Sequence, residues 1–193
     1  MSRFGQWALA ALAAGLAACA TTAAPGPTEV TSCAVQGHAR ALCHSVVVDA
    51  SPADVWALIS TSDGWRSWAA PVAEVDLRIG GEIETSYDRT ARIGGPGNIH
   101  NRIASFEPNR SLVIQIAQAP PGFPHADEAR NLSTVLALER RGSRTLVRVT
   151  MSGFRDGEAY DALYRFFDAG NAYTLNKLAE RIENGPTNWA EQR

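Results

Sequence analysis

The feature that most constrains the fold is a series of short strand-like segments enclosed by two helical segments. A β-branched run at residues 44–50 leads directly into a helical segment at 51–60, and residues 156–185 form a long amphipathic segment that ends in the helix stop Asn-Gly-Pro. Six strand-like segments separated by turn residues lie between them: VAEVDLRI, GEIETSYD, NIHNRIASF, SLVIQIA, LSTVLALE and RTLVRVTMS. This order predicts an α+β fold, in which a curved antiparallel sheet of about seven strands surrounds a long C-terminal helix.

The two helical segments carry clear local signals. Ser51 is a natural N-cap, Pro52 suits the first helical position, and Asp54 completes an acidic variant of the capping box. In the long segment, the residues predicted to fall on one side are Tyr160, Tyr164, Phe167, Asn171, Leu175, Leu178 and Ile182.

Four stretches in the right order carry a family resemblance. They are DASPADVWALIS followed by Trp65 and Trp68, the strand pair VDLRIGGEIE, the segment IASFEPNRSLVIQ, and VLALERRGSRTLVRVTMSGF before the last helix. From about Ser45 to Gly185 the chain resembles the START-like or SRPBCC superfamily, and is similar to its Hsp90-ATPase-activator homologue branch. The resemblance implies a helix-grip fold with a cavity between the concave sheet face and the terminal helix. It implies no single chemistry, because members bind lipids, hormones or polyketides, act as cyclases, or assist a chaperone.

Alternation along the strands predicts which side chains face the cavity, since neighbouring side chains of a strand point to opposite faces. The more apolar set, taken as inward, is Ile83, Thr85 and Tyr87; Ile99, Asn101 and Ile103; Leu112, Ile114 and Ile116; Leu132, Thr134, Leu136 and Leu138; Val147, Val149 and Met151. The opposite set, expected to face water, holds Glu82, Glu84, His100, Arg102, Glu139 and Arg148.

The inward set favours a binding module over an enzyme. An apolar cavity with a few neutral hydrogen-bonding groups suits a bound ligand, whereas a cyclase or dehydratase needs a positioned acid or base. The predicted ligand-binding residues are Trp68, Tyr87, Asn101, Thr134, Tyr164, Phe167 and Asn171, and no catalytic residue is assigned. A bulge or a shifted register would turn His100 and Arg102 inward and make them the best catalytic candidates. The aromatic residues could equally fill a closed core, which leaves a ligand-free interaction protein as a third possibility.

The N-terminus predicts export and lipid attachment. The apolar run from Trp7 to Ala18 is shorter than the roughly 20 residues of a membrane-spanning helix, and it follows the single positive residue Arg3. Leu16-Ala17-Ala18-Cys19 also resembles the bacterial lipobox, which implies cleavage before Cys19 and acylation of that cysteine. Ala20 follows where Asp tends to retain such proteins in the inner membrane, so the expected place is the outer membrane, facing the periplasm. Export also separates the domain from any cytoplasmic chaperone, so a role with Hsp90 is not expected.

These signals divide the chain into four parts: a signal peptide at 1–18, a lipidated tether at 19–32, one START-like domain at 33–185, and a C-terminal tail at 186–193. Cys33 and Cys43 are the remaining cysteine pair in an oxidising compartment, so a disulfide is expected. Two free thiols, or a metal site with His38 and His44, are the alternatives, although the spacing fits no familiar zinc pattern.

Charge and motifs limit the partners. The formal net charge is -2, which gives no field for nucleic acid or an anionic surface. The chain lacks a G-x-S-x-G elbow, an H-E-x-x-H helix and a P-loop, so we expect no cofactor and no metal. The expected partners are a small hydrophobic molecule and, through the lipid anchor, a membrane; the sequence specifies no protein partner. The proline-rich connection 118–131 could be a lid over the cavity or a loose surface loop.

Overall fold

The computed structural model describes residues 29–35, 37 and 40–191. Cys19 and the predicted signal peptide lie outside these residues, as does His38. In the part of the chain that the structure describes, no helix combines the length and the apolar character needed to cross a bilayer. The elements, in chain order, are β1 (Thr31–Ser32), β2 (Leu42–Val48), α1 (Pro52–Ser60), α2 (Ser62–Arg66), β3 (Val72–Val75), β4 (Glu82–Ser86), β5 (Ile99–Glu107), β6 (Ser111–Gln118), α3 (Ala126–Ala129), β7 (Ser133–Arg141), β8 (Arg144–Ser152) and α4 (Glu158–Asn184).

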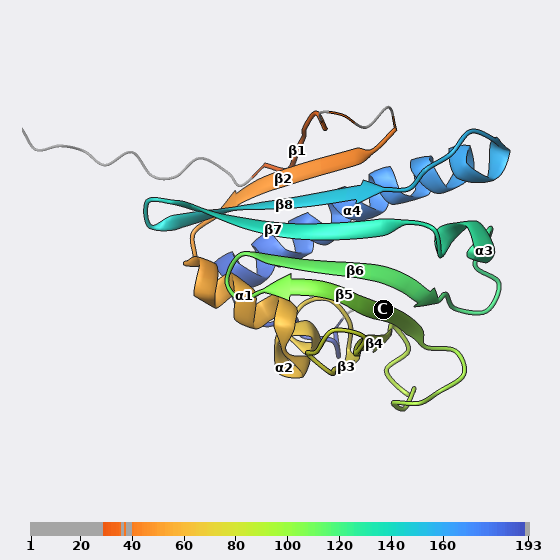
Figure 1. The fold of residues 1–193 in the computed structure, drawn as a ribbon. Coiled ribbons are helices and arrows are strands. Elements are labelled where there is room, and N and C mark those ends of the chain that lie inside the picture. Colours follow the sequence, from red (N-terminus) through yellow and green to blue (C-terminus); the bar gives the residue numbers. More distant parts are fainter. Residues whose placement is uncertain (1–28, 36, 38–39, 192–193) are drawn as a thin grey trace, which may run out of the picture.

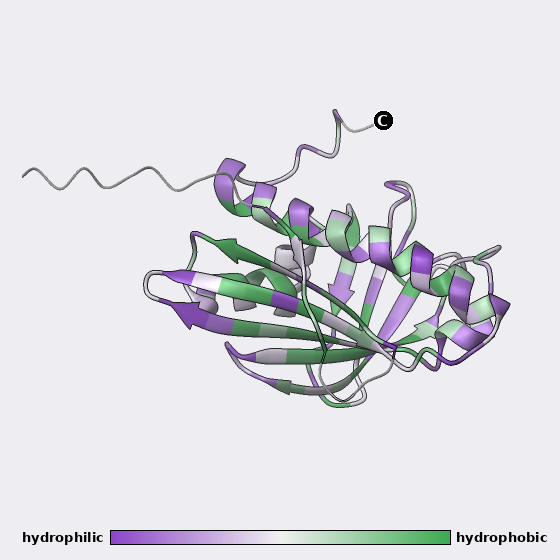
Figure 2. Cartoon of the chain, turned by 90° about the horizontal axis from the view of Figure 1, so that it is seen from above, coloured by the Kyte–Doolittle hydropathy of each residue, from purple (hydrophilic) through white to green (hydrophobic). Residues whose placement is uncertain are grey.

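The strands form a single curved antiparallel sheet in the order β1-β2-β8-β7-β6-β5-β4-β3. The long helix α4 lies along one side of this sheet, so the predicted helix-grip fold is confirmed (Figures 1 and 2). The sheet has eight strands rather than about seven. The additional strand is β1, in which Thr31 pairs with Ser45 and Ser32 with His44. The last two residues of the predicted tether therefore belong to the sheet edge.

The first helix forms as its sequence predicts. The Ser51 hydroxyl accepts a hydrogen bond from the Asp54 backbone N–H at 3.2 Å, and the Asp54 carboxylate accepts one from the Ser51 N–H in return. Val55 and Ile59 of α1 are fully buried. The short helix α2 follows at once, capped by Thr61, whose hydroxyl accepts from the Gly64 N–H at 3.0 Å. Together α1 and α2 close one end of the curved sheet (Figure 1).

The apolar core is divided into two clusters along α4. One cluster joins the C-terminal half of the helix, through Leu175 and Leu178, to β2, β8 and α1. The other joins its N-terminal half, through Tyr160 and Leu163, to Leu42 and to the α3 region. Because both ends of the helix are anchored on packed apolar side chains, its middle is held over the sheet at a fixed position.

The pairing of β5 with β6 has two register shifts, one between His100 and Asn101 and one between Ile103 and Ser105, and the second is a β-bulge that changes the predicted alternation. Ile103 pairs with Ile114 and Ser105 pairs with Val113, so Ala104 is the extra residue in β5. The bulge shifts Phe106 to the inner face, where it pairs with Leu112 and its ring lies 6.2 Å from that of Trp56. The bulge does not turn His100 inward, because His100 precedes the bulge in the strand.

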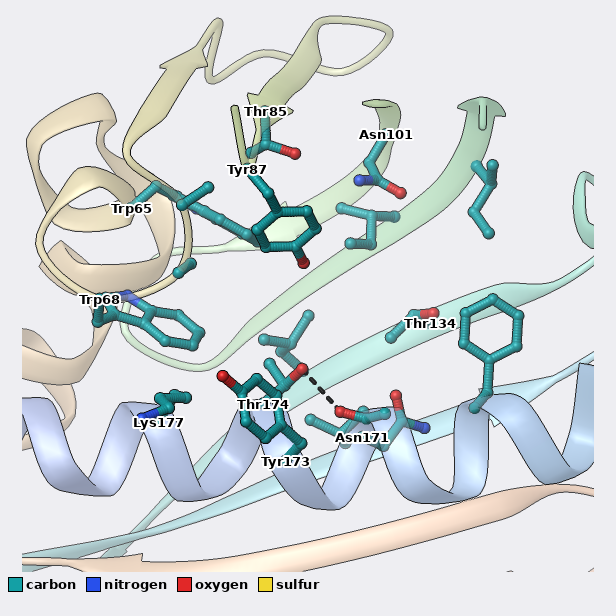
Figure 3. Close-up of a pocket in the computed structure, with 18 of the residues that line it drawn as sticks. Trp65, Trp68, Thr85, Tyr87, Asn101, Thr134, Asn171, Tyr173, Thr174 and Lys177 are labelled. Atoms are coloured by element: carbon teal, nitrogen blue, oxygen red, sulfur yellow. Dashed lines mark hydrogen bonds between the residues drawn. The ribbon is translucent and has the colours of Figure 1, made fainter. Parts of the chain in front are cut away.

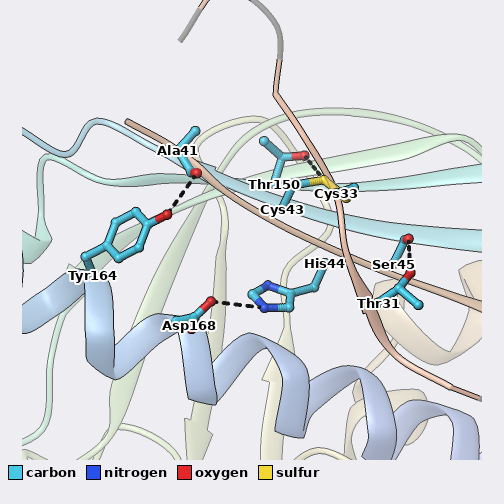
Figure 4. Close-up of a disulfide and its surroundings, with 9 residues drawn as sticks. All are labelled: Thr31, Cys33, Ala41, Cys43, His44, Ser45, Thr150, Tyr164 and Asp168. Atoms are coloured by element: carbon cyan, nitrogen blue, oxygen red, sulfur yellow. Dashed lines mark hydrogen bonds and ion pairs between the residues drawn. A yellow bond between two sulfur atoms is a disulfide. The ribbon is translucent and has the colours of Figure 1, made fainter. Parts of the chain in front are cut away.

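The N-terminal edge strand is joined to β2 beside the two cysteines. The Cys33 N–H donates to the Cys43 carbonyl at 2.9 Å, and their Cα atoms are 4.9 Å apart. The two Sγ atoms lie at bonding distance, and Figure 4 draws them as a disulfide. The oxidation state of this pair in the mature protein stays a prediction.

Candidate functional site: a cavity between the sheet and the terminal helix

A cavity of about 570 Å³ lies between the concave sheet face and the middle of α4. This volume is within the range of sites that bind small organic molecules. Only part of the predicted inward set lines the cavity. The inward positions Ile83, Ile103, Leu112, Leu138 and Val147 do not line it and belong to the packed core. The apolar lining residues of the sheet are Ile114, Ile116, Leu136, Val149 and Met151.

Three neutral polar side chains interrupt this apolar wall. Thr85, Asn101 and Thr134 come from β4, β5 and β7, and Figure 3 shows all three directed into the cavity. They can bind oxygen or nitrogen atoms of a ligand without adding charge to the wall.

The helix wall shows where the predicted stripe on α4 divides. Phe167 and Asn171 line the cavity, as does Thr174 one turn further on. Tyr164 does not line it, which corrects the expectation that it forms the opposing wall. Its hydroxyl donates to the Ala41 carbonyl at 3.4 Å (Figure 4). Its ring packs edge-on against Phe154.

The reason is the position of Tyr164 around the helix. Tyr164 and Asp168, four residues apart, lie on the edge of α4 that faces β2, where Asp168 Oδ1 is 3.2 Å from Nε2 of the buried His44 (Figure 4). The other edge, Gly170, Thr174 and Lys177, faces the cavity. A single stripe drawn on a helical wheel includes residues of both edges.

Asn171 contributes a polar atom with no partner among the described residues. Its side chain is only 8% exposed, and its Nδ2 is buried without a hydrogen bond within that part of the chain. A buried amide N–H without a partner carries an energetic cost, which an acceptor atom on a ligand would remove.

One end of the cavity is closed by tryptophan. The rings of Trp65 and Trp68 stack at 5.7 Å, and their indole N–H groups donate to the Ile59 and Leu58 carbonyls. Both residues line the cavity. Trp68, predicted as a ligand contact, is therefore placed at the site with its polar atom already bonded, so its ring offers only apolar surface.

Trp189 is a third tryptophan at this cavity, and it is not among the residues predicted for the site. Residues 186–193 were predicted to be a tail outside the domain. The structure instead packs the described part of this tail on α2: the Trp189 indole N–H donates to the Arg66 carbonyl at 2.6 Å, and the Thr187 N–H donates to the Ser67 carbonyl at 2.8 Å. The sequence signal that could have predicted this contact is a tryptophan shortly after the helix stop, since a large apolar ring favours burial.

Tyr87 lies just after β4, and its ring extends into the cavity (Figure 3). The side chain is 72% exposed, because it borders the open space of the cavity. The surrounding protein nevertheless reduces its hydration enough to raise the pKa of the Tyr87 hydroxyl, and the Tyr173 phenol raises this pKa further. Tyr87 therefore stays neutral near pH 7 and can both donate and accept a hydrogen bond.

Lys177 and Arg89 also line the cavity and were not predicted to do so. Lys177 is the only lysine of the chain. Its Nζ lies 2.7 Å from Glu180 Oε2 and 5.6 Å from the centre of the Tyr173 ring. Arg89 donates from Nη1 to the Trp189 carbonyl at 2.7 Å. The spacing of Lys177 from Gly170 and Thr174 was the available signal, because residues three or four apart share a helix face.

The opposite face of the sheet contains the histidine that a shifted register would have turned inward. His100 Nδ1 is 2.9 Å from Glu82 Oε2, and neither His100 nor Arg102 lines the cavity. Glu84, expected to face water, is only 9% exposed. Its carboxylate accepts hydrogen bonds from the Gly94 N–H and from Asn98, which compensate for its burial.

A second cavity of about 470 Å³ adjoins the first and shares Tyr87, Asn101 and Phe167 with it. Its far side is the connection 118–131, in which Phe123 packs edge-on against Phe166 at 5.2 Å. This connection therefore borders a cavity mouth and includes α3. His125 within it is exposed.

Comparisons with known proteins agree with this architecture. Residues 40–183, about three quarters of the chain, match the family described as "Polyketide cyclase / dehydrase and lipid transport", and the chain belongs to this family. No curated protein matches the chain in sequence.

In the described residues there is no cluster of three or more histidine, cysteine or acidic side chains that could hold a metal ion.

Several solved structures share the fold. The Aha1 dimer from Colwellia psychrerythraea has a TM-score of 0.60 and 20% identity, over 76% of this chain and 98% of that one. MLL2253 from Mesorhizobium loti has a TM-score of 0.60 and 18% identity, over 77% and 100%. CalU16 from Micromonospora echinospora has a TM-score of 0.57 and 20% identity, over 84% and 86%. At such identities the likeness shows the fold and leaves the ligand open.

Proposed function

We propose that the protein is a lipid-anchored carrier or sensor that binds a small hydrophobic molecule in the cavity between the sheet and α4. The cavity itself carries the proposal: it is large enough for a ligand, its wall is mostly apolar, and Asn171 presents a buried amide nitrogen that lacks a partner among the described residues. Burial of the ligand's apolar surface would supply the affinity, at roughly 25 cal/mol per Å². Thr85, Asn101 and Thr134 would orient it.

The main alternative is an enzyme of the cyclase or dehydratase type that uses the same cavity. Such an enzyme needs an acid or base at the reacting atoms. The described residues that line the larger cavity include no histidine and no carboxylate, so the ionisable side chains there that can release a proton are the Tyr87 and Tyr173 phenols and the Lys177 ammonium group. Asp88 lines only the smaller cavity, and hydrogen bonds from the Thr90 backbone and hydroxyl lower its pKa. These observations favour binding without turnover.

A third possibility is an interaction lipoprotein with a closed core. The aromatic residues would then pack against one another and leave no space. The cavity between Trp68 and Phe167 favours a ligand instead.

The proposed location rests on the N-terminal sequence. Acylation of Cys19 would hold the domain at the outer membrane, facing the periplasm, and more than one acyl chain makes such anchoring stable. In this compartment we propose that Cys33 and Cys43 form a disulfide, which joins β1 to β2.

Titration with the neutral fluorophore N-phenyl-1-naphthylamine tests the binding proposal. We expect a saturable rise in fluorescence that corresponds to one site per chain. The proposal would be contradicted if the protein bound neither this fluorophore nor any hydrophobic compound extracted from the envelope.

A further inference from the structure

The charged residues of the larger cavity are all of one sign. Of the described residues that line it, only Arg89 and Lys177 carry a full charge near pH 7, and both are cations. The two come from separate segments, the loop after β4 and the C-terminal half of α4. An otherwise apolar wall with two cations and no carboxylate is suited to a ligand that carries negative charge.

Lys177 is held in its charged form. The hydrogen bond from its ammonium group to Glu180 is the main cause that raises the pKa of Lys177. Burial is the second-largest cause and opposes it, and smaller electrostatic effects of Glu180 and Tyr173 raise the pKa further. Glu180 is exposed and does not line the cavity. An ammonium group has three N–H donors, so the contact with Glu180 leaves two for other acceptors.

Arg89 is positioned by the C-terminal tail. Its Nη1 donates to the Trp189 carbonyl, and Trp189 is itself held on Arg66. A guanidinium has five N–H donors and can bind both oxygens of a carboxylate. The contact with Trp189 uses one of these donors, so others remain for a ligand.

One cation, Lys177, and two of the neutral polar groups, Asn101 and Thr134, lie toward different ends of the cavity. Figure 3 shows Lys177, Trp68 and Tyr173 at one end and Asn101 and Thr134 toward the other. The cavity lining also includes Ile114, Leu136 and the other apolar residues of the sheet. A ligand with an acidic group at one terminus and an extended apolar body fits this distribution.

We propose that the cavity selects amphipathic carboxylates, with the acidic group bound by Lys177 and Arg89 and the apolar body on the sheet wall. This inference rests on the proposed binding function and specifies its ligand class. It excludes neutral sterol-like or hydrocarbon ligands as the preferred occupants. It also predicts that binding weakens as salt screens the exposed part of the ion pair.

The test compares decanoate with decanol and with decyltrimethylammonium, which share the same alkyl chain. Each compound displaces N-phenyl-1-naphthylamine from the purified full-length chain, prepared without alkyl detergent. Decanoate is expected to compete about tenfold better than decanol, which corresponds to about 1.4 kcal/mol. Lys177→Gln should remove most of this preference by weakening the competition by decanoate, while decanol competes as it does with the wild type. Lys177→Arg should retain the preference. Arg165→Gln, which removes one charge from an exposed position of the same helix, is the matched control.

The outcomes separate the two proposals. If the fluorophore binds but decanol competes as well as decanoate, or the ammonium compound competes better, the carboxylate inference is wrong and the binding function stands. If Lys177→Gln and Arg165→Gln reduce decanoate binding equally, the positive charge of the helix acts at long range. In that case the assignment of the carboxylate to Lys177 in the cavity is wrong. If no compound binds, both proposals are wrong.

Discussion

Substitution of Thr134 by Trp should fill the cavity and abolish ligand-induced stabilisation. Thr134 projects from β7 into the cavity, where an indole ring would occupy space between the sheet and α4. The cavity holds about 570 Å³, so the larger side chain can enter without forcing the core apart. We therefore expect a folded variant whose melting temperature without ligand lies within about 5 °C of the wild-type value.

The size of the effect follows from linkage. A ligand present at one hundred times its Kd stabilises the native state by about 2.7 kcal/mol. The unfolding entropy of a domain of roughly 150 residues is about 0.3 kcal/mol per K, so the wild-type melting temperature should rise by about 9 °C. In Thr134→Trp the rise should fall to about 1 °C, as measured by circular dichroism with and without N-phenyl-1-naphthylamine.

Val135→Trp is the matched control. Val135 is the next residue of β7 and points to the opposite face of the sheet, so the same indole is added outside the cavity. This variant should keep the full stabilisation. A folded Thr134→Trp protein that is stabilised as strongly as the wild type would refute the reasoning that the ligand occupies this cavity.

Three further predictions concern the anchor, the cysteines and the outer face. Cys19→Ala should yield a soluble protein or an unprocessed precursor, and unchanged detergent-dependent fractionation with normal cleavage would count against lipidation. Thiol labelling of the denatured, unreduced protein should detect neither Cys33 nor Cys43, and their joint replacement by Ala should cost about 2–3 kcal/mol in urea unfolding; full labelling of both would exclude the bridge. His100→Ala and Arg102→Ala should leave fluorophore affinity within about twofold, because neither residue lines the cavity. Loss of a measurable turnover in these variants would instead support the enzyme.

The sheet wall of the site could be predicted from the sequence because the direction of each side chain depends on its position within its own strand. Side chains alternate along a strand whatever the strand pairs with, so an apolar pattern was enough to place Asn101 and Thr134 inward. The capping box at Ser51 was predictable for the same reason, since it joins residues three positions apart.

The remaining features depend on how distant segments pack. Tyr164 and Phe167 belong to one helical stripe, and only the position of α4 over β2 decides that Tyr164 faces the strand. The hydrogen bond between Arg89 and the Trp189 carbonyl joins positions one hundred residues apart, and no sequence periodicity predicts such a contact. The bulge at Ala104 depends on pairing with β6, so Phe106 could not be assigned to a face in advance.

Native mass spectrometry of the protein purified from its own envelope tests whether the cavity holds a ligand. We expect a species heavier than the lipidated chain, whose extra mass is released on denaturation and yields a small hydrophobic molecule on extraction. This species should be missing from Thr134→Trp and present in Val135→Trp. Spectra of the wild type and Thr134→Trp that both show only the lipidated chain, with nothing released, would mean that the cavity carries no such ligand.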